Sequence, residues 1–316
     1  LAGELSKRGF EASAFFCNSG AEANEAAIKF ARRYSERFGS GGYKILSFEN
    51  SFHGRTLGAL SATGQEKYRR GFEPLPGGFE YVPYNDIKAL EEKIGSDPGV
   101  CALLMEPVQG EGGVIPARPE FMRAVREICN QNDVLLIFDE VQTGVGRSGK
   151  FFCYQNYEIE PDLVTLAKGL GGGYPIGALL VRRELRAGLQ PGEHASTFGG
   201  NPFVCAMALT VLEAIDREEI LQNVVERGRQ LEEGLQKLAA EYGPLKNPRG
   251  VGLMIGLPLE DSLPASELME ACRRQGLIVG TAGKNSLRFV PPLIISEDEI
   301  VELLERLKKA LQEQLF

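Results

Sequence analysis

The sequence lacks the clusters that metal centres and disulfide frameworks need. It has two histidines, which lie far apart, and no two cysteines are spaced as a CxxC pair. Zinc sites and disulfide-rich folds both depend on such groupings, so neither is expected. The six cysteines are instead scattered. This usage fits a reducing compartment, and we expect the protein to be cytoplasmic.

An excess of basic residues and a long apolar run are also absent. The chain has 35 Lys and Arg residues against 43 Asp and Glu, a formal net charge of −8. A nucleic-acid-binding protein would need a basic face. A membrane span would need about 18 consecutive apolar residues, and no stretch reaches that length. We therefore expect small-molecule partners, with no nucleic acid and no membrane.

No initiator methionine is present. The chain begins at Leu1 inside LAGELSKRGF, which has the pattern of a helix. We therefore expect the sequence to be incomplete at its N-terminus.

Short apolar runs alternate with helical patterns through the first part of the chain. Helices are expected after Gly20 and over Asp86–Ile94 and Pro119–Asn130. Strands are expected at Tyr43–Phe48, Phe79–Val82, Cys101–Met105, Val134–Phe138, Leu163–Leu166 and Ile176–Val181. This alternation predicts an α/β fold with a mostly parallel sheet flanked by helices. In such sheets, ligands bind at the carboxyl ends of the strands.

A second, smaller α/β domain is expected towards the C-terminus. A Gly-rich loop near Pro191–Pro202 leads into a helical segment from residue 203 to 239, with a break near Asp216. Further elements are expected in the order strand Leu253–Leu257, helix Ala265–Gln275, strands Leu277–Val279 and Ser286–Val290, and helix Glu297–Gln314. We predict a large domain over residues 1–206, and a linking helix with the small domain over residues 207–316.

Asn18–Glu22 opens the first long helix. Ser19 and Glu22 have the spacing of a capping box. Gly20 and Ala21 leave backbone N–H groups uncovered at the first turn, which suits a bound phosphate. An ordinary capped helix explains the same pattern, so from spacing alone both interpretations stay open.

Two charged residues follow predicted strands. Asp139 comes directly after the apolar Val134–Phe138, and it is either a pocket residue or the start of a loop. Ionised, it could hold a cation such as a protonated ring nitrogen.

Lys168 lies between a strand and the glycine run Gly169–Gly173. In apolar, crowded surroundings its amine would be a nucleophile for a carbonyl, and otherwise it is a solvated loop lysine. The glycine run matches neither a Walker loop nor a dinucleotide fingerprint, which disfavours a nucleotide-binding enzyme.

Two arginines are candidates for anion binding. Arg55 follows Phe52 and His53, and it could bind a carboxylate through its two-pronged guanidinium. His53 could be a base, although a structural, hydrogen-bonded histidine is the better interpretation. Arg288 has apolar neighbours on a predicted strand, so it needs either a structural ion-pair partner or an anion.

Several segments, in order along nearly the whole chain, resemble the class III aminotransferases, a branch of the fold-type-I pyridoxal 5′-phosphate enzymes. They are FFCNSGAEANEAAIKFAR, SFHGRTLGALSATGQEKY, MEPVQGEGGV, LLIFDEVQTGVGRSGKFF, PDLVTLAKGLGGGYPIGA, STFGGNPFVCA and LRFVPPLIIS. Within the class, SATGQEKYRRGFEPLPGGFEYVPYND is most similar to the acetylornithine aminotransferases.

The resemblance implies pyridoxal 5′-phosphate as cofactor and assigns the residues around it. Lys168 would hold the cofactor as a Schiff base and carry the proton during the reaction, and Asp139 would pair with the ring nitrogen. The ring would contact Val141 and Phe52 on its two faces and Gln142 at its phenolic oxygen. The phosphate would be held by Gly20 and Ala21, and by Thr197 of the neighbouring subunit, which implies a homodimer with sites at the interface. Arg55, Glu111 and Arg288 would bind substrate carboxylates.

The implied reaction moves an amino group between N2-acetylornithine and 2-oxoglutarate, in arginine biosynthesis. Sister transaminases acting on ornithine, succinylornithine or a lysine-pathway amine share the cofactor residues and stay open. A non-catalytic cofactor-binding protein is a further alternative, which the intact Lys168 and Asp139 disfavour.

Overall fold

The computed structural model describes residues 1–315. The chain forms two compact units, each described here by itself. Unit 1 comprises Leu1–Pro107, Ala117–Val145 and Phe151–Ala214, and unit 2 comprises Val108–Pro116, Gly146–Lys150 and the residues from Ile215 onward. The sequence predicted one domain boundary, after residue 206. In the structure the last boundary between the units follows Ala214, and unit 2 also includes two short segments from earlier in the chain.

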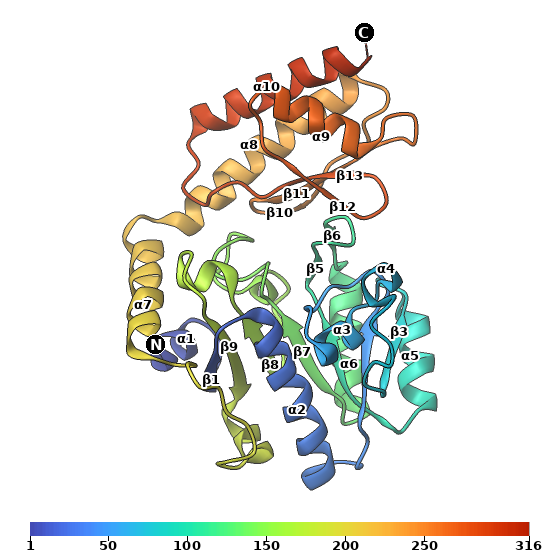
Figure 1. Ribbon diagram of the computed structural model, residues 1–316, viewed down its shortest axis with the longest axis vertical. Helices are drawn as coiled ribbons and strands as arrows, with labels where there is room; N and C mark the ends of the chain where they lie inside the picture. The colour runs from blue at the N-terminus through green and yellow to red at the C-terminus, as the bar shows by residue number, and fades with distance from the viewer. Residues whose placement is uncertain (316) are drawn as a thin grey trace. The chain divides into compact units, whose positions relative to one another are not determined.

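A seven-stranded sheet forms the centre of unit 1, in the order β1-β9-β8-β7-β4-β2-β3 (Figure 1). Its strands are β1 (Ala12–Cys17), β2 (Lys44–Phe48), β3 (Phe79–Val82), β4 (Val100–Met105), β7 (Leu135–Asp139), β8 (Leu163–Leu166) and β9 (Gly177–Arg182). Every neighbouring pair from β8 to β3 is parallel, whereas β9 runs antiparallel to both β8 and β1. The mostly parallel sheet predicted from the sequence is therefore confirmed.

The six predicted strands of this sheet are all present, with ends within one residue of the prediction. The edge strand β1 was not predicted. Most of its residues are only half buried, and its partner β9 lies more than 150 positions later in the chain. Neither its local pattern nor its neighbours therefore indicated a strand.

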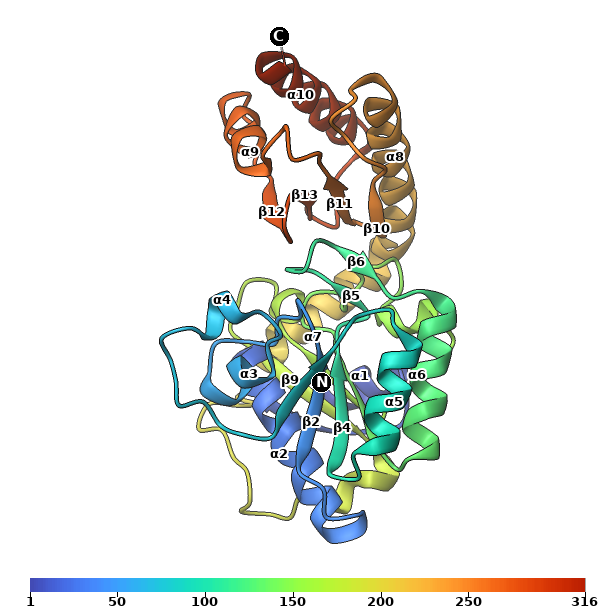
Figure 2. The same cartoon turned by 90° about the vertical axis from the view of Figure 1, so that its right-hand side faces the viewer.

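Helices cover both faces of the sheet (Figure 2). Helix α2 (Gly20–Phe38) lies with α3 (Leu57–Ala62) on one face, and α5 (Ile87–Ser96) lies with α6 (Pro119–Gln131) on the other. Helix α2 buries an alanine-rich stripe that includes Phe30 in a core shared with Ile45 and Ile137 of the sheet. Small side chains bring the backbone of α2 close to the strands, which positions its N-terminus at their carboxyl ends.

The remaining elements of unit 1 are short or lie at its ends. They are α1 (Ala2–Arg8), α4 (Glu66–Arg69), the 3₁₀ helices η1 (Cys153–Asn156), η2 (Lys168–Gly171) and η3 (Arg183–Gly188), and most of α7 (Pro202–Arg217). The helical break predicted near Asp216 is confirmed, because α7 ends at Arg217 and Glu219 has a left-handed φ of 50°.

Unit 2 contains a four-stranded antiparallel sheet in the order β10-β11-β13-β12, with three helices on one face (Figure 1). The strands are β10 (Arg249–Val251), β11 (Met254–Pro258), β12 (Gly280–Ala282) and β13 (Ser286–Phe289), and the helices are α8 (Ile220–Glu241), α9 (Ala265–Arg274) and α10 (Glu297–Leu315). The strands β5 (Val108–Gln109) and β6 (Ile115–Pro116) form a hairpin in the same unit.

One predicted element of unit 2 is wrong. Leu277–Val279 is not a strand, and the strand begins later, at Gly280. Gly276 has a φ of +73° in the turn after α9, and Ile278 is 92% exposed, so this apolar run is irregular backbone between the turn and the strand. Over residues 1–315 no helix is both long and apolar enough to cross a membrane.

Candidate functional site

A cavity of about 580 Å³ opens at the carboxyl ends of the parallel strands of unit 1. Asp139 is the last residue of β7, and Lys168 follows the end of β8 by two positions. The two therefore share one edge of the sheet, as the predicted topology requires. Of the predicted site residues, those that line the cavity are Gly20, Ala21, Phe52, Arg55, Asp139, Val141, Gln142 and Lys168.

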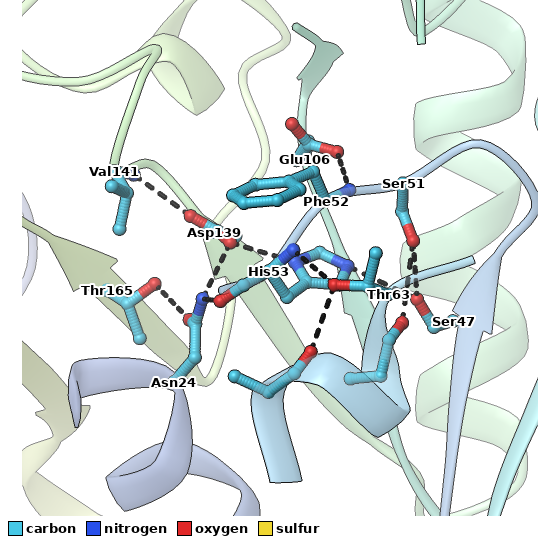
Figure 3. A network of polar contacts seen from close by, with 12 residues as sticks. Asn24, Ser47, Ser51, Phe52, His53, Thr63, Glu106, Asp139, Val141 and Thr165 are labelled. Atoms are coloured by element: carbon cyan, nitrogen blue, oxygen red, sulfur yellow. Dashed lines mark hydrogen bonds and ion pairs between the residues drawn. The ribbon is translucent and has the colours of Figure 1, made fainter. Parts of the chain in front are cut away.

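Asp139 is only 4% exposed, and hydrogen-bond donors surround its carboxylate (Figure 3). Its Oδ2 accepts a hydrogen bond from Asn24 Nδ2 at 2.8 Å and lies 2.8 Å from His53 Nδ1. Its Oδ1 accepts a hydrogen bond from Val141 N at 3.0 Å. A buried carboxylate needs hydrogen-bond partners of this kind, because its oxygens are removed from water. The Asp139 carboxylate is therefore fixed in orientation at the cavity wall.

His53 is buried between Asp139 and a pair of serines (Figure 3). Its Nε2 lies 3.2 Å from Ser47 Oγ, which lies 3.1 Å from Ser51 Oγ. An imidazole with Nδ1–H directed at Asp139 accepts from the Ser47 hydroxyl at Nε2, so every polar atom is satisfied. His53 is thus the structural, hydrogen-bonded histidine that the sequence favoured.

Asn24 was not singled out from the sequence. Its Nδ2 bonds the carbonyl of His53 at 2.7 Å as well as Asp139, and its Oδ1 accepts from Thr165 Oγ1 at 2.8 Å. The sequence did contain a signal for this role. Asn24 is a polar residue within the apolar stripe of α2, beside Ala23 and Ala27. A polar side chain on a buried helix face needs partners there.

The N-terminus of α2 forms a bare backbone surface at the cavity. Ser19 accepts a hydrogen bond from Glu22 N at 3.2 Å, as predicted. In a complete capping box the Glu22 carboxylate would accept a hydrogen bond from Ser19 N. Here it accepts one from Asn18 N, one residue earlier. Within residues 1–315, the N–H groups of Gly20 and Ala21 have no hydrogen-bond partner. A Cβ on Gly20 would lie 2.6 Å from Val141 Cγ1, so only glycine fits there. Free N–H groups at a helix N-terminus fit an anion such as a phosphate.

Glu25, one residue beyond Asn24, connects α2 to α3. Its Oε1 accepts hydrogen bonds from Thr56 Oγ1 at 2.6 Å, Gly58 N at 2.8 Å and Ala59 N at 3.0 Å. A carboxylate at the first turn of a helix satisfies unpaired N–H groups and is favoured by the helix dipole. Glu25 therefore fixes the start of α3, directly after Arg55.

Lys168 begins the 3₁₀ helix η2 with a left-handed backbone, at a φ of 39°. Residues other than glycine seldom adopt this conformation, which costs roughly 1–3 kcal/mol and is found mostly at functional sites. The residue is exposed and lines the cavity. Of the two surroundings that the sequence left open for Lys168, the exposed position in this single chain matches the solvated one.

Glu140, next to Asp139, is completely buried and is not among the residues that line the cavity. It accepts hydrogen bonds from Cys153 N at 2.6 Å and Tyr154 N at 2.8 Å. Burial raises the pKa of Glu140 to about 8, an effect that those two hydrogen bonds oppose and the charge of Asp139 reinforces. Glu140 therefore ties η1 to the end of β7.

The remaining predicted residues lie outside this cavity. Thr197 is exposed and lines a second cavity of about 440 Å³ with Asn18 and Ser196. Glu111 and Arg288 belong to unit 2, where Arg288 Nη1 lies 2.5 Å from Glu111 Oε1. These two residues, far apart in the sequence, do form an ion pair.

Three kinds of group around the cavity fit three parts of pyridoxal phosphate. Two free backbone N–H groups suit its phosphate, a fixed carboxylate suits its ring nitrogen, and a lysine amine suits its aldehyde. No group of three or more potential metal ligands occurs in the described part of the chain.

Comparison with known proteins gives a consistent result. Residues 1–311 match the model of the aminotransferase class-III family. The acetylornithine aminotransferase of Caldanaerobacter subterraneus is 51% identical over 100% of this chain and 80% of its own length, and that of Prochlorococcus marinus subsp. pastoris is 52% identical over 98% and 76%.

Solved structures agree with this fold. The ornithine aminotransferase of Toxoplasma gondii has a TM-score of 0.94 at 32% identity, covering 99% of this chain and 76% of that one. The N-acetylornithine aminotransferase of Stenotrophomonas maltophilia has a TM-score of 0.85 at 37% identity, covering 99% and 79%. The chain therefore belongs to the class III aminotransferases, enzymes that depend on pyridoxal 5′-phosphate.

Proposed function

We propose that this chain transfers an amino group between N2-acetylornithine and 2-oxoglutarate, giving the acetylated glutamate semialdehyde and glutamate. The observation that carries the proposal is the identity of 51–52%, over almost the whole chain, to relatives named acetylornithine aminotransferase. The reaction belongs to arginine biosynthesis, and the scattered free cysteines fit a cytoplasmic enzyme.

Pyridoxal phosphate, when bound, supplies electron withdrawal from the substrate carbon that loses its proton. The Asp139 carboxylate keeps the ring nitrogen protonated, and its three fixed donors hold it in that position. The amine of Lys168 binds the cofactor and then moves the proton at the substrate carbon.

The other residues that contact the cofactor hold it in place. Gly20 and Ala21 would hold the phosphate through their N–H groups, Phe52 and Val141 would contact the ring, and Gln142 would donate to its phenolic oxygen. Thr197 lies outside the cavity of its own chain. This supports its assignment to the phosphate of a neighbouring subunit, and hence a homodimer.

Three further residues bind the carboxylates of the substrates. Glutamate reacts through its α-amine and has carboxylates at both ends, whereas acetylornithine reacts through its δ-amine and has only a distal carboxylate. Arg55 binds the distal carboxylate of both substrates, and Arg288 binds the α-carboxylate of glutamate. Glu111 neutralises Arg288 when no α-carboxylate is present, because an unpaired, largely buried guanidinium is costly.

The test of the donor is a half-reaction screen of the holoenzyme, which follows the cofactor absorbance with acetylornithine, ornithine, succinylornithine and lysine. Acetylornithine should give the largest single-turnover kcat/KM. A larger value for ornithine or succinylornithine would replace the proposed donor with that amine.

Two variants test the residue roles. Lys168→Ala should retain the fold but lose the covalently bound cofactor and all turnover, as seen by borohydride reduction and mass spectrometry. Asp139→Asn should retain the cofactor and lose on the order of 10²-fold or more in rate, because an amide cannot stabilise the protonated ring nitrogen. Near-normal turnover of either variant would refute the corresponding role.

A further inference from the structure

The Arg55 guanidinium lies against two aromatic rings. Its Cζ is 4.3 Å from the ring centroid of Tyr68 and 5.3 Å from that of Phe52. The two rings meet edge to face, with centroids 5.5 Å apart and an interplanar angle of 81°. Phe52 and Arg55 both line the cavity, whereas Tyr68 is not among its lining residues.

This contact leaves the hydrogen-bonding capacity of Arg55 available. A guanidinium that packs on a ring through its face keeps its N–H donors in the plane, where they can bind both oxygens of a carboxylate. Among residues 1–315, no hydrogen bond or ion pair involves the Arg55 side chain, and the residue is exposed. Its guanidinium is therefore oriented by rings while its donors stay unpaired.

Tyr68 is itself held in place by its neighbour on α4. Arg69 lies over the Tyr81 ring at 4.6 Å and donates from Nη1 to Tyr81 Oη at 2.8 Å. The Tyr81 hydroxyl in turn donates to the carbonyl of Ser61 on α3. Through these contacts the four-residue helix α4 is connected to β3 and α3, so the Tyr68 ring has a fixed support.

We propose that Tyr68 is a positioning residue for substrate: its ring holds the Arg55 guanidinium at the orientation that receives a distal carboxylate. The inference rests on the proposed role of Arg55 as the carboxylate receptor, and it adds a residue that never touches the substrate. A long arginine side chain free in solvent has many rotamers to lose on binding. A ring that already restricts it makes binding tighter.

The experiment measures the dissociation constant of glutarate, a dicarboxylate of the same length as 2-oxoglutarate, by calorimetry on the holoenzyme. Tyr68→Leu should weaken glutarate binding by about 3- to 10-fold, because binding must then immobilise an arginine side chain that the ring no longer restricts. Tyr68→Phe, which keeps the ring, should bind glutarate within about twofold of the unchanged protein. Tyr68→Met, which also removes the ring but stays unbranched, replaces the leucine variant if that one does not fold.

Arg55→Ala and the double variant Arg55→Ala/Tyr68→Leu complete a double-mutant cycle. If Tyr68 acts through Arg55, the loss of the ring should have no further effect once Arg55 is gone. Lys67→Ala is the matched control, because Lys67 Nζ lies 4.8 Å from the same ring but lies outside the cavity lining. It should leave the dissociation constant unchanged.

The outcomes separate this inference from the function on which it rests. Weaker binding in Arg55→Ala but not in Tyr68→Leu would overturn the role of Tyr68 alone. Unchanged binding in Arg55→Ala would overturn the receptor role of Arg55, and the positioning role with it. Equal losses in Tyr68→Phe and Tyr68→Leu would show that the hydroxyl matters and the ring does not, which also contradicts the inference.

Discussion

The two arginines predicted to bind carboxylates are held in opposite ways. In unit 1, Arg55 lies on the rings of Phe52 and Tyr68 with no acidic partner among residues 1–315. In unit 2, Arg288 is largely buried, at 18% exposure of its side chain, and is paired with Glu111. Aromatic rings orient a guanidinium without using its N–H groups, whereas a carboxylate accepts hydrogen bonds from those N–H groups.

This difference has a functional meaning under the proposed reaction. A permanently available arginine suits a carboxylate that both substrates carry, and an arginine with its own anion suits a carboxylate that only one substrate carries. The Nε of Arg288 is buried without a hydrogen-bond partner, so Glu111 satisfies that guanidinium only in part. A second anion could therefore compete for it.

Arg55→Ala should have the largest effect. It removes a charge-assisted, two-pronged contact to both substrates, so kcat/KM should fall by about 10²-fold in both half-reactions. Single-turnover kinetics with acetylornithine and with glutamate measure the two losses. A loss confined to one substrate would break the comparison, because Arg55 would then not be the shared receptor.

Arg288→Ala should give a smaller and unequal loss. The glutamate half-reaction should slow by about 10- to 100-fold, because its α-carboxylate loses its partner, while the acetylornithine half-reaction stays within a few fold. Single-turnover kinetics with acetylornithine and with glutamate measure these two losses as well. Equal losses in the two half-reactions would mean that Arg288 and Glu111 are a fixed structural pair.

Glu111→Ala should produce the reverse asymmetry at about tenfold. Without Glu111, Arg288 stays open to carboxylates, so binding of acetylornithine in the wrong orientation increases and its half-reaction slows. The glutamate half-reaction should change less. Glu111→Gln serves as the control that keeps side-chain volume, and a faster acetylornithine half-reaction in either variant would contradict this reasoning.

The smallest effect concerns Glu140, a buried carboxyl group with no ion pair among residues 1–315. Because burial raises the pKa of Glu140 to about 8 from its usual 4.5, the folded state binds more protons than the unfolded state between these values. The contribution of Glu140 to stability is thus complete below pH 4.5 and declines as pH rises towards 8. In urea unfolding of the apoprotein, Glu140→Gln should lose less stability than the unchanged chain between pH 5 and 8, by at most about 1.4 kcal/mol per pH unit. Parallel pH profiles would show that Glu140 does not titrate in this range.

The sequence predicted those parts of the molecule that local pattern determines. Apolar runs located six strands of the large sheet, and the positions of Asp139 and Lys168 at or just after the ends of two of these strands placed them at one edge. The missed features depend on contacts between distant segments. Asn24 contacts Asp139 across 115 positions, and β1 pairs with a strand that only the fold brings near. The strand prediction at Leu277–Val279 was wrong for another reason, because an irregular segment that exposes Ile278 can carry the same apolar residues as a strand.

The first two turns of α2 carry groups that reach three separate parts of the site. Gly20 and Ala21 present N–H groups at the cavity, Asn24 bonds Asp139, and Glu25 bonds the start of α3. An α-helix rotates about 100° and rises 1.5 Å per residue, so one added or deleted residue redirects every side chain beyond it. Insertion or deletion between Ala21 and Asn24 would therefore put the N–H groups at the cavity out of register with the contacts of both Asn24 and Glu25, whereas many substitutions on the outer face of α2 would affect none of them. In descendants of this gene, length should be invariant across these residues even where the sequence drifts.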